Sequence, residues 1–182
     1  MLVPMRAILD AADKNGYAQG AFNVNAVCQV KAAVDVHQIL RSPAIIQGAD
    51  LANGFMGGRT DFANSTLEDK KAGAKNIGAA VKKYAADSDI PVALHLDHGK
   101  NFDSCIAAIE GGYTSVMIDG SSLPFDENVE LTREVVKYAH ERGVTVEGEL
   151  GVLAGVEDHV FAATSTYTNP LSAIDFFKKT GV

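Results

Sequence analysis

Two periodicities alternate along the chain and predict its elements. Short segments rich in Val, Ile and Ala predict buried strands, because these residues pack well on both faces of a pleated sheet. Between them, apolar residues recur about every three or four positions, as on one face of an amphipathic helix. The predicted strands are, in chain order, GAFNV, PAIIQ, PVALHLD, TSVMIDG and VTVEGELG.

The helical pattern occupies the segments around these strands. The predicted helices cover residues 2–14, 26–40, 65–86, 102–110, 126–143 and 170–180. Ser65 and Glu68 are expected to form a capping box, in which their side chains satisfy free backbone N–H groups at the start of the third helix. Residues 48–64 are rich in glycine and are expected to be irregular, as is the Gly, Ser and Thr-rich segment before Asn169.

The alternation of strands and helices predicts an α/β protein with parallel strands joined by right-handed crossovers. This order fits either a doubly wound open sheet or part of an eight-stranded barrel. Neither a GxGxxG motif nor a P-loop follows the first strand, which argues against a nucleotide-binding sheet. His95 and Asp97 share one face of a strand, and a barrel with a polar, metal-filled mouth accounts for such residues better than an open sheet.

Acidic residues and a histidine stand at the carboxyl ends of the last three predicted strands. These residues are Asp97 and His98, then Asp119, and then Glu149. The carboxyl ends of the strands carry the functional residues in both architectures. Nitrogen and oxygen ligands suit a divalent metal ion such as zinc, with one carboxylate left for proton transfer. Glu147 and Glu149 share a strand face and would repel each other without a cation or a hydrogen-bond donor.

Each of these residues also has an ordinary structural interpretation. Asp119 precedes Gly-Ser-Ser and fits a turn former, His98 fits a hydrogen-bonded helper, and the two glutamates fit a solvated sheet edge. His95 is interpreted as structural, because side chains three positions apart on a strand diverge and form no His-x-His metal pair. The combination of residues at three neighbouring strand ends favours the metal site.

Composition and charge narrow the possible partners. The 182 residues are 47% hydrophobic and 21% charged, which fits one soluble domain over residues 1–182. The net charge of −7, with no run of more than two Lys or Arg, argues against nucleic acid and favours a small molecule or a protein. Without a recognisable signal peptide or an apolar span of about 18 residues, a cytoplasmic protein with no membrane partner is expected. Cys28 and Cys105 are expected to be reduced and to face the core from two helices.

Five stretches of the sequence carry a resemblance to a known family. The matching stretches are GAFNVNA, PAIIQGA, LHLDHG, GGYTSVMIDGS and VEGELGVLAGVED. Over essentially all its residues the chain resembles the amino-terminal part of the class II, metal-dependent ketose-bisphosphate aldolases, above all the fructose-bisphosphate aldolases. The resemblance implies a TIM (β/α)8 barrel, here only about its first five β/α units. It also implies zinc-dependent cleavage of the sugar bisphosphate fructose 1,6-bisphosphate to dihydroxyacetone phosphate and glyceraldehyde 3-phosphate.

The resemblance implies a role for individual residues as well. His98 matches a ligand of the catalytic zinc ion, and Asp119 and Glu149 match ligands of a second divalent metal position. Asp97 matches the proton donor to the substrate oxygen at the bond that is cleaved. Glu157 matches a mobile-loop carboxylate that exchanges a proton at the enediolate carbon.

Two features limit what the resemblance implies. Asn23 matches a substrate-facing residue, but Ala49 stands where the family commonly has a serine that helps to hold a substrate phosphate. The family's later zinc-binding histidines and phosphate loops would follow residue 182, so this chain is expected to be truncated and inactive by itself. A tagatose-bisphosphate aldolase and a non-catalytic barrel subunit are the alternatives, and the full-length form is expected to be a homo-oligomer.

Overall fold

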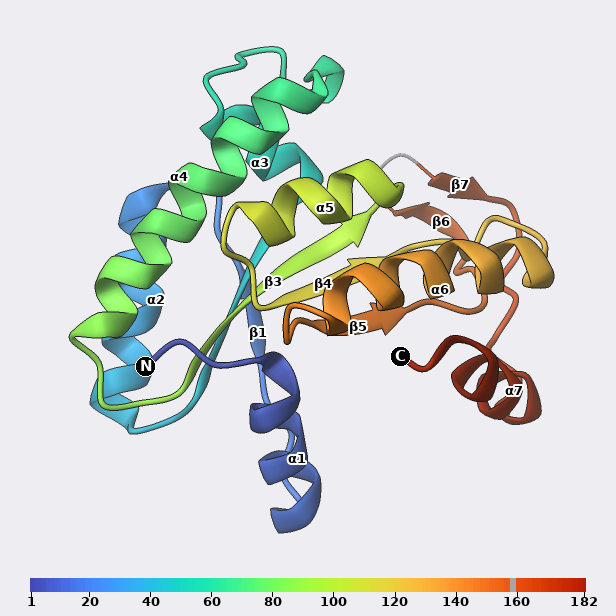
Figure 1. Ribbon diagram of the computed structural model, residues 1–182, viewed down its shortest axis with the longest axis horizontal. Coiled ribbons are helices and arrows are strands. Elements are labelled where there is room, and N and C mark those ends of the chain that lie inside the picture. The colour runs from blue at the N-terminus through green and yellow to red at the C-terminus, as the bar shows by residue number, and fades with distance from the viewer. Residues whose placement is uncertain (158–159) are drawn as a thin grey trace.

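The computed structural model describes residues 1–157 and 160–182, and its centre is a sheet of five parallel strands (Figure 1). The strands lie side by side in chain order: β1 (Ala21–Asn23), β2 (Ala44–Ala49), β3 (Val92–Gly99), β4 (Ser115–Ile118) and β5 (Thr145–Gly148). Each neighbouring pair is parallel. The five predicted strands and the α/β class are therefore confirmed.

Helices cover one face of this sheet, with further helices at its ends. The helices are α1 (Met5–Asn15), α2 (Val27–Leu40), α3 (Asp50–Met56), α4 (Leu67–Ala86), α5 (Phe102–Glu110), α6 (Phe125–His140) and α7 (Pro170–Thr180), with a 3-10 turn at Phe62–Asn64. Side chains of α2, α4, α5 and α6 pack into one apolar core with the strands. Figure 1 shows α1 projecting beyond one end of the strands and α7 lying on the β5 side.

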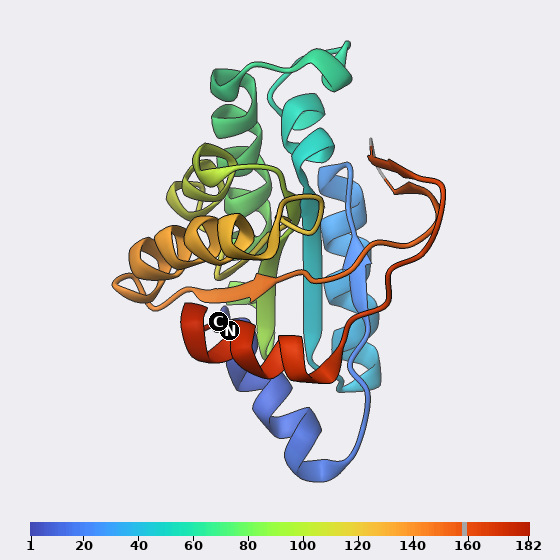
Figure 2. The same cartoon turned by 90° about the vertical axis from the view of Figure 1, so that its right-hand side faces the viewer.

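A short antiparallel hairpin precedes α7. It consists of β6 (Gly155–Glu157) and β7 (Val160–Ala162). Figure 2 shows the hairpin on the side of the sheet opposite α4, α5 and α6. The expectation of a loop was wrong here, because such short strands do not display an alternating pattern long enough to recognise.

The expectation of an irregular segment over residues 48–64 was also wrong, because the segment contains α3. Two of the buried side chains of α3 are polar. Asp50 forms an ion pair with Lys70, and Asn53 accepts a hydrogen bond of 2.8 Å from the buried Tyr113 hydroxyl. A helix whose buried positions are polar has no apolar periodicity in its sequence. Tertiary hydrogen bonds therefore account for α3.

The capping box of α4 is shifted by one residue from its predicted place. Thr66, not Ser65, is the N-cap, and its Oγ1 accepts a hydrogen bond of 3.3 Å from the Asp69 backbone N–H. The Asp69 carboxylate in turn accepts a hydrogen bond of 2.8 Å from the Thr66 backbone N–H. Aspartate thus takes the part expected of Glu68, because its shorter side chain reaches the N-cap from the third helical position.

Strand alternation gives the sheet two faces of different chemistry. The helix-covered face carries fully buried apolar residues, among them Leu94, Leu96, Val116 and Ile118. The opposite face, which we call the inner face, carries polar residues toward the carboxyl ends of the strands: Gln47, His95, Asp97 and Glu147. The same strands therefore hold both the core and the polar groups that a site requires.

Helix α1 covers the inner face near the amino ends of the strands. Met5 and Ile8 pack there against Ile45 and Ala93. The helix begins after Pro4 and ends at Gly16, whose left-handed φ of 67° suits a glycine. The inner face is thus apolar at one end and polar at the other.

The two cysteines differ in their surroundings. Both are free, and Cys105 is buried, as expected. Cys28 is exposed, so that expectation was wrong, because α2 turns Val30 and Val34 toward the core and Cys28 away from it. Among the described residues, no helix combines the length and the apolar character needed to cross a membrane.

Candidate metal site

The backbone at the end of β3 determines where His98 points. Regular alternation would turn His98 to the helix-covered face, but its φ of 49° is left-handed, and the pairing of β3 with β4 shifts register at this point. Gly99 follows in a crowded space, where a Cβ atom would lie 2.6 Å from the Met117 carbonyl oxygen and 2.9 Å from the Cys105 Sγ. The left-handed backbone of His98 costs roughly 1 kcal/mol or more in a residue other than glycine, and such strain is typical of functional sites.

The turned imidazole brings three potential metal ligands together. The Nδ1 atom of His98 lies 3.0 Å from the Asp119 Oδ2 and 3.6 Å from the Glu149 Oε2. One ligand atom from each of the three residues lies within 4.8 Å of the others, and all three side chains are partly buried. One imidazole nitrogen and two carboxylates at such spacing fit a single divalent cation.

The electrostatics of this cluster without a metal ion follow from its hydrogen bonds. The hydrogen bond with Asp119 raises the pKa of His98 to about 9. The same hydrogen bond, with help from Ser121, lowers the pKa of Asp119 to about 2. Ser121 donates to the Asp119 Oδ1 from its backbone N–H at 3.0 Å and from its hydroxyl at 2.6 Å. A bound metal ion would replace the proton on the His98 imidazole, because either positive charge balances the carboxylates of Asp119 and Glu149.

A residue that the sequence pattern did not reveal fixes the backbone beside Glu149. Asn128 of α6 is buried, and its side-chain amide donates a hydrogen bond of 2.8 Å to the Glu149 carbonyl oxygen. Thr132, one turn later, donates a hydrogen bond of 3.1 Å to the Asn128 Oδ1. A polar pair four residues apart on the buried side of an amphipathic helix was the available signal.

Asp97 lies beside two residues that were predicted to face a substrate. The Oδ2 of Asp97 accepts a hydrogen bond of 2.9 Å from the Asn23 side-chain amide. Ala49 lies directly opposite Asp97 in the pairing of β2 with β3. Three predicted site residues from three strands thus meet, whereas the Glu157 side chain lies outside the part of the chain that the structure describes.

A second chain of polar contacts crosses the inner face below this cluster. The buried His95 places its Nδ1 2.8 Å from the Ser115 Oγ and its Nε2 3.5 Å from the Glu147 Oε2. Burial lowers the pKa of His95 to about 4, so its ring is neutral near pH 7. Burial also raises the pKa of Glu147, although about half of its side-chain surface (48%) is exposed, because the side chain sits in a hollow.

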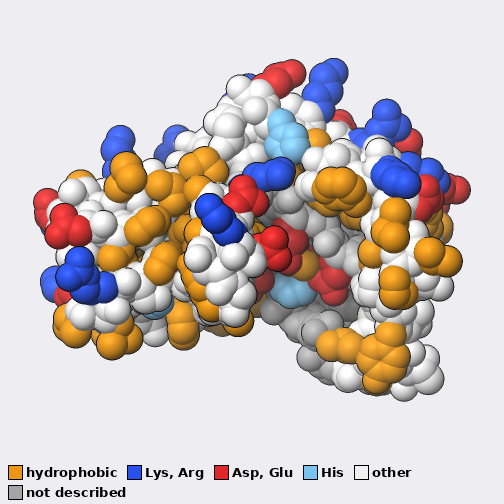
Figure 3. Space-filling model, turned by 90° about the horizontal axis from the view of Figure 1, so that it is seen from below, with side chains coloured by type: hydrophobic (Ala, Val, Ile, Leu, Met, Phe, Trp, Pro, Cys, Tyr) orange, Lys and Arg blue, Asp and Glu red, His pale blue; other side chains and the backbone are white. Residues whose placement is uncertain are grey.

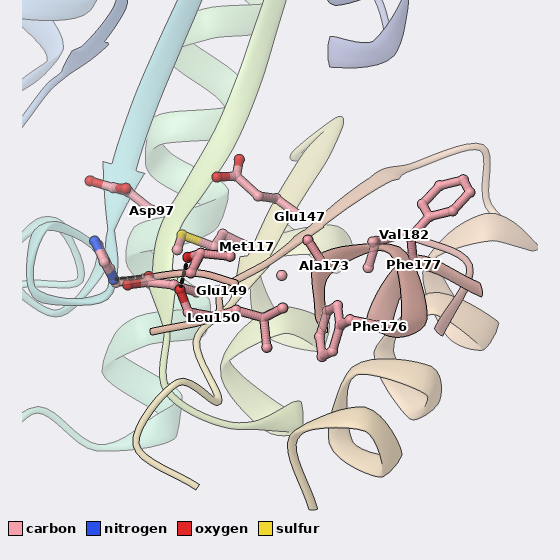
Figure 4. A pocket seen from close by; sticks show the side chains of 12 residues that line it. Asp97, Met117, Glu147, Glu149, Leu150, Ala173, Phe176, Phe177 and Val182 are labelled. Atoms are coloured by element: carbon pink, nitrogen blue, oxygen red, sulfur yellow. Dashed lines mark hydrogen bonds and ion pairs between the residues drawn. The ribbon is translucent and has the colours of Figure 1, made fainter. Parts of the chain in front are cut away.

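Residues of both groups, His98 and Glu149 of the first and Glu147 of the second, line a cavity of about 540 Å³. Figure 3 shows a hollow in the molecular surface in which acidic side chains and a histidine gather. The polar lining residues are Asp97, His98, Glu147, Glu149 and Thr168, and Phe176 and Phe177 of α7 are among the apolar ones. Figure 4 shows Met117 between the Glu147 and Glu149 side chains. The cavity suits a small polar ligand.

Fold and site together define an α/β protein with parallel strands whose carboxyl ends carry a ligand set that fits a divalent metal ion. The sequence model described as "Fructose-bisphosphate aldolase class-II" matches residues 3–182. The chain belongs to this family.

Curated relatives and solved structures agree with this membership. The chain is 47% identical over 185 residues to a fructose-bisphosphate aldolase of Treponema pallidum, with 100% of the chain and 52% of that protein covered. It is 40% identical over 183 residues to one of Geobacillus stearothermophilus, with 58% of that protein covered. The crystal structure of the YdjI aldolase from Escherichia coli K12 matches with a TM-score of 0.76 at 30% identity, covering 100% of this chain and 58% of that one. The chain thus spans about half the length of the relatives it matches.

Proposed function

We propose that the chain supplies the first β/α units and much of the active site of a zinc-dependent fructose-bisphosphate aldolase. The observation that carries the proposal is the meeting of His98, Asp119 and Glu149 within 4.8 Å, with Asp97 lining the same cavity. Metal ligands next to a separate carboxylate are what a metal-assisted aldol cleavage requires. The proposed reaction is the reversible cleavage of fructose 1,6-bisphosphate to dihydroxyacetone phosphate and glyceraldehyde 3-phosphate.

We propose that residues 1–182 form a single domain, which is an incomplete barrel. The activity would require the complete barrel. Large apolar side chains are exposed on the helices at the two edges of the sheet. These residues are Val36, Ile39 and Leu40 on α2, and Leu171, Ile174 and Phe177 on α7. Exposed apolar surface of this kind marks a site of association. The β/α units that correspond to the other half of the relatives would cover both edges and close the sheet.

The residues of this chain would divide the chemistry between them. When bound, zinc would supply Lewis-acid polarisation of the substrate carbonyl. Asp97 would accept the proton of the hydroxyl at the cleaved bond and return it in the condensation direction. The hydrogen bond of 2.9 Å from Asn23 would hold the Asp97 carboxylate in place for this transfer. Glu157 is proposed to exchange the proton at the enediolate carbon.

The metal ligands are proposed to form two metal positions that lie close together. His98 would hold the catalytic ion, and Asp119 and Glu149 would form the second position. The contacts of His98 with both carboxylates, at 3.0 and 3.6 Å, support a shared site. Ala49 offers no side-chain hydroxyl to a substrate phosphate, so a phosphate at this point would rely on backbone N–H groups.

Two measurements test this function. Zinc content by elemental analysis is expected to reach about one equivalent in the chain and to fall to background in His98→Ala. Cleavage is then assayed after co-expression with the carboxyl-terminal part of one of the relatives, which supplies the remaining units. Zinc-dependent cleavage of fructose 1,6-bisphosphate supports the proposal. Faster cleavage of tagatose 1,6-bisphosphate would favour the tagatose enzyme, and zinc binding without cleavage of either sugar would favour a non-catalytic subunit.

A further inference from the structure

The proposed metal site leaves one acidic residue of the cavity without a role. Glu147 lines the same cavity as His98 and Glu149 and lies on the inner face of β5, two residues before Glu149, which follows the end of that strand. Two residues along a strand span roughly 6.5 Å, a distance that a glutamate side chain can largely bridge. A half-exposed carboxylate so near a divalent cation would be drawn into its coordination sphere unless another group held it.

A buried imidazole lies beside Glu147. The His95 Nε2 is 3.5 Å from the Glu147 Oε2, a polar contact longer than an ordinary hydrogen bond, and Figure 4 shows the Glu147 carboxylate turned away from Glu149. His95 is only 3% exposed, and its other nitrogen lies 2.8 Å from the hydroxyl of the fully buried Ser115. A buried hydroxyl needs an acceptor, and a carboxylate accepts only. Ser115 therefore donates to the Nδ1 of His95, and the Nε2–H of His95 faces Glu147.

We propose that His95 is a positioning residue that holds Glu147 toward the floor of the cavity and thereby keeps this carboxylate off the metal ion. The contacts Ser115–His95–Glu147 cross three neighbouring strands, β4, β3 and β5. The two buried residues, Ser115 and His95, are confined by the packing around them. The consequence is an ion with fewer protein ligands and more open coordination positions. Open positions are what a catalytic metal site needs for its substrate, in contrast to a closed structural site. The inference rests on the metal site of the proposed function.

Cobalt in place of zinc gives a direct test, because its visible absorption weakens as its coordination number rises. In His95→Leu the chain is expected to bind Co²⁺ about tenfold more tightly, the scale on which groups around metal ligands act, and with weaker absorption. His95→Leu combined with Glu147→Gln is expected to restore both values to those of the wild type. His95→Gln, whose amide can still donate to Glu147, is expected to resemble the wild type. His140→Leu, on the exposed side of α6, is the matched control for loss of a histidine.

Three results would overturn the inference. In the first, Co²⁺ affinity and absorption in His95→Leu stay at their wild-type values; in the second, the double variant keeps the changes of the single one. The third applies even if His95→Leu does not fold, because the ring tautomer is measurable by ¹⁵N NMR in the wild-type chain without metal. Nε2–H is expected there, and Nδ1–H would contradict the restraint. A wild-type chain that binds no Co²⁺ contradicts the proposed metal site itself and removes this inference with it, a result distinct from the other three.

Discussion

On the helix-covered face of the sheet the helices pack so closely that their backbones touch, whereas the inner face contains an open cavity. A Cβ atom on Gly78 of α4 would lie 2.0 Å from the Gly111 carbonyl oxygen, so α4 and the end of α5 touch through their backbones. On the inner face, by contrast, Glu147 keeps about half of its side-chain surface (48%) exposed in a cavity. Both faces are built from the same strands, because side chains alternate between them.

Alternate positions along one strand therefore serve different purposes: one set stabilises the fold and the other lines the cavities. Even-numbered positions of β3, such as Leu94 and Leu96, are fully buried and contribute to the core. Odd-numbered positions, such as His95 and Asp97, line the cavities of the inner face. Substitutions on the helix-covered face should therefore lower the free energy of unfolding, and substitutions on the inner face should change binding and catalysis.

The largest expected effect is that of Asp97→Ala on cleavage. In the completed barrel, loss of the carboxylate proposed to transfer the proton should lower kcat about a thousandfold or more. Zinc content and the free energy of unfolding should change little, because Asp97 is not among the three clustered ligands and is only partly buried. Steady-state kinetics, elemental analysis and urea unfolding measure the three quantities.

His98→Ala is the matched variant for this prediction, because it alters the adjacent residue. It should lose the metal ion, and cleavage should fall as a result. Equal loss of zinc from Asp97→Ala and His98→Ala would show that the two residues have no separate roles. A large drop in unfolding free energy in Asp97→Ala would break the separation between the two faces.

Gly78→Ala tests the helix-covered face. Helix propensity alone would make this substitution stabilising by about 1 kcal/mol. The contact with the Gly111 carbonyl oxygen should reverse the sign and lower the free energy of unfolding by about 2–3 kcal/mol, because neither backbone can move without unpacking a helix. Urea unfolding gives the value. Ala79→Gly, at the exposed neighbouring position, is the control and should show the propensity cost alone. A stabilised Gly78→Ala would refute the close approach.

The His98–Asp119 pair predicts a pH window of stability for the metal-free chain. The pKa of Asp119, lowered to about 2, gives stability that is full above its unfolded value of about 4 and is lost as the pH falls toward 2. The pKa of His98, raised to about 9, gives stability that is full below about pH 6.5 and is lost as the pH rises through 9. The change should be on the order of 1–2 kcal/mol, since both groups are partly exposed.

Thermal unfolding followed by circular dichroism between about pH 3 and pH 10 tests this window. Saturating zinc should flatten the alkaline loss, because a metal-bound imidazole has already released its proton. Asp119→Asn should also flatten the alkaline loss without zinc, because His98 loses its main partner. An alkaline loss that is equal with and without zinc would mean that His98 does not bind the ion.

Sequence periodicity predicted the five strands because each strand is a compact apolar run between amphipathic helices. It also placed Asp97, Asp119 and Glu149 at one rim, since parallel strands end at the same edge of a sheet. His98 was predicted at this rim as well, but the left-handed φ that turns it there could not be predicted, because it depends on the register shift beside it. The distances between His98 and the two carboxylates thus emerged only in three dimensions.

The missed parts of the molecule share a physical cause. Helix α3 has a buried Asp50 and Asn53, whose partners Lys70 and Tyr113 are distant in sequence. Asn128 likewise acts on the backbone of Glu149 from a different element. Long-range polar contacts leave no apolar periodicity in the sequence, so α3 could not be recognised from its pattern, and Asn128 was marked just by its spacing of four residues from Thr132.

The smallest expected effect lies at the N-cap of α4 and distinguishes local from long-range control of the fold. Thr66→Ala removes the hydroxyl that accepts from the Asp69 N–H, which should lower the free energy of unfolding by about 1 kcal/mol. Ser65→Ala, the residue that the sequence pattern favoured, should cost less, because the structure gives the N-cap role to its neighbour. Zinc affinity should be unchanged in both, since the cap lies on the helix layer and not on the inner face. If Ser65→Ala proves the costlier change, the cap lies where the sequence pattern placed it. A change of zinc affinity in Thr66→Ala would instead show that the helix layer and the inner face are coupled.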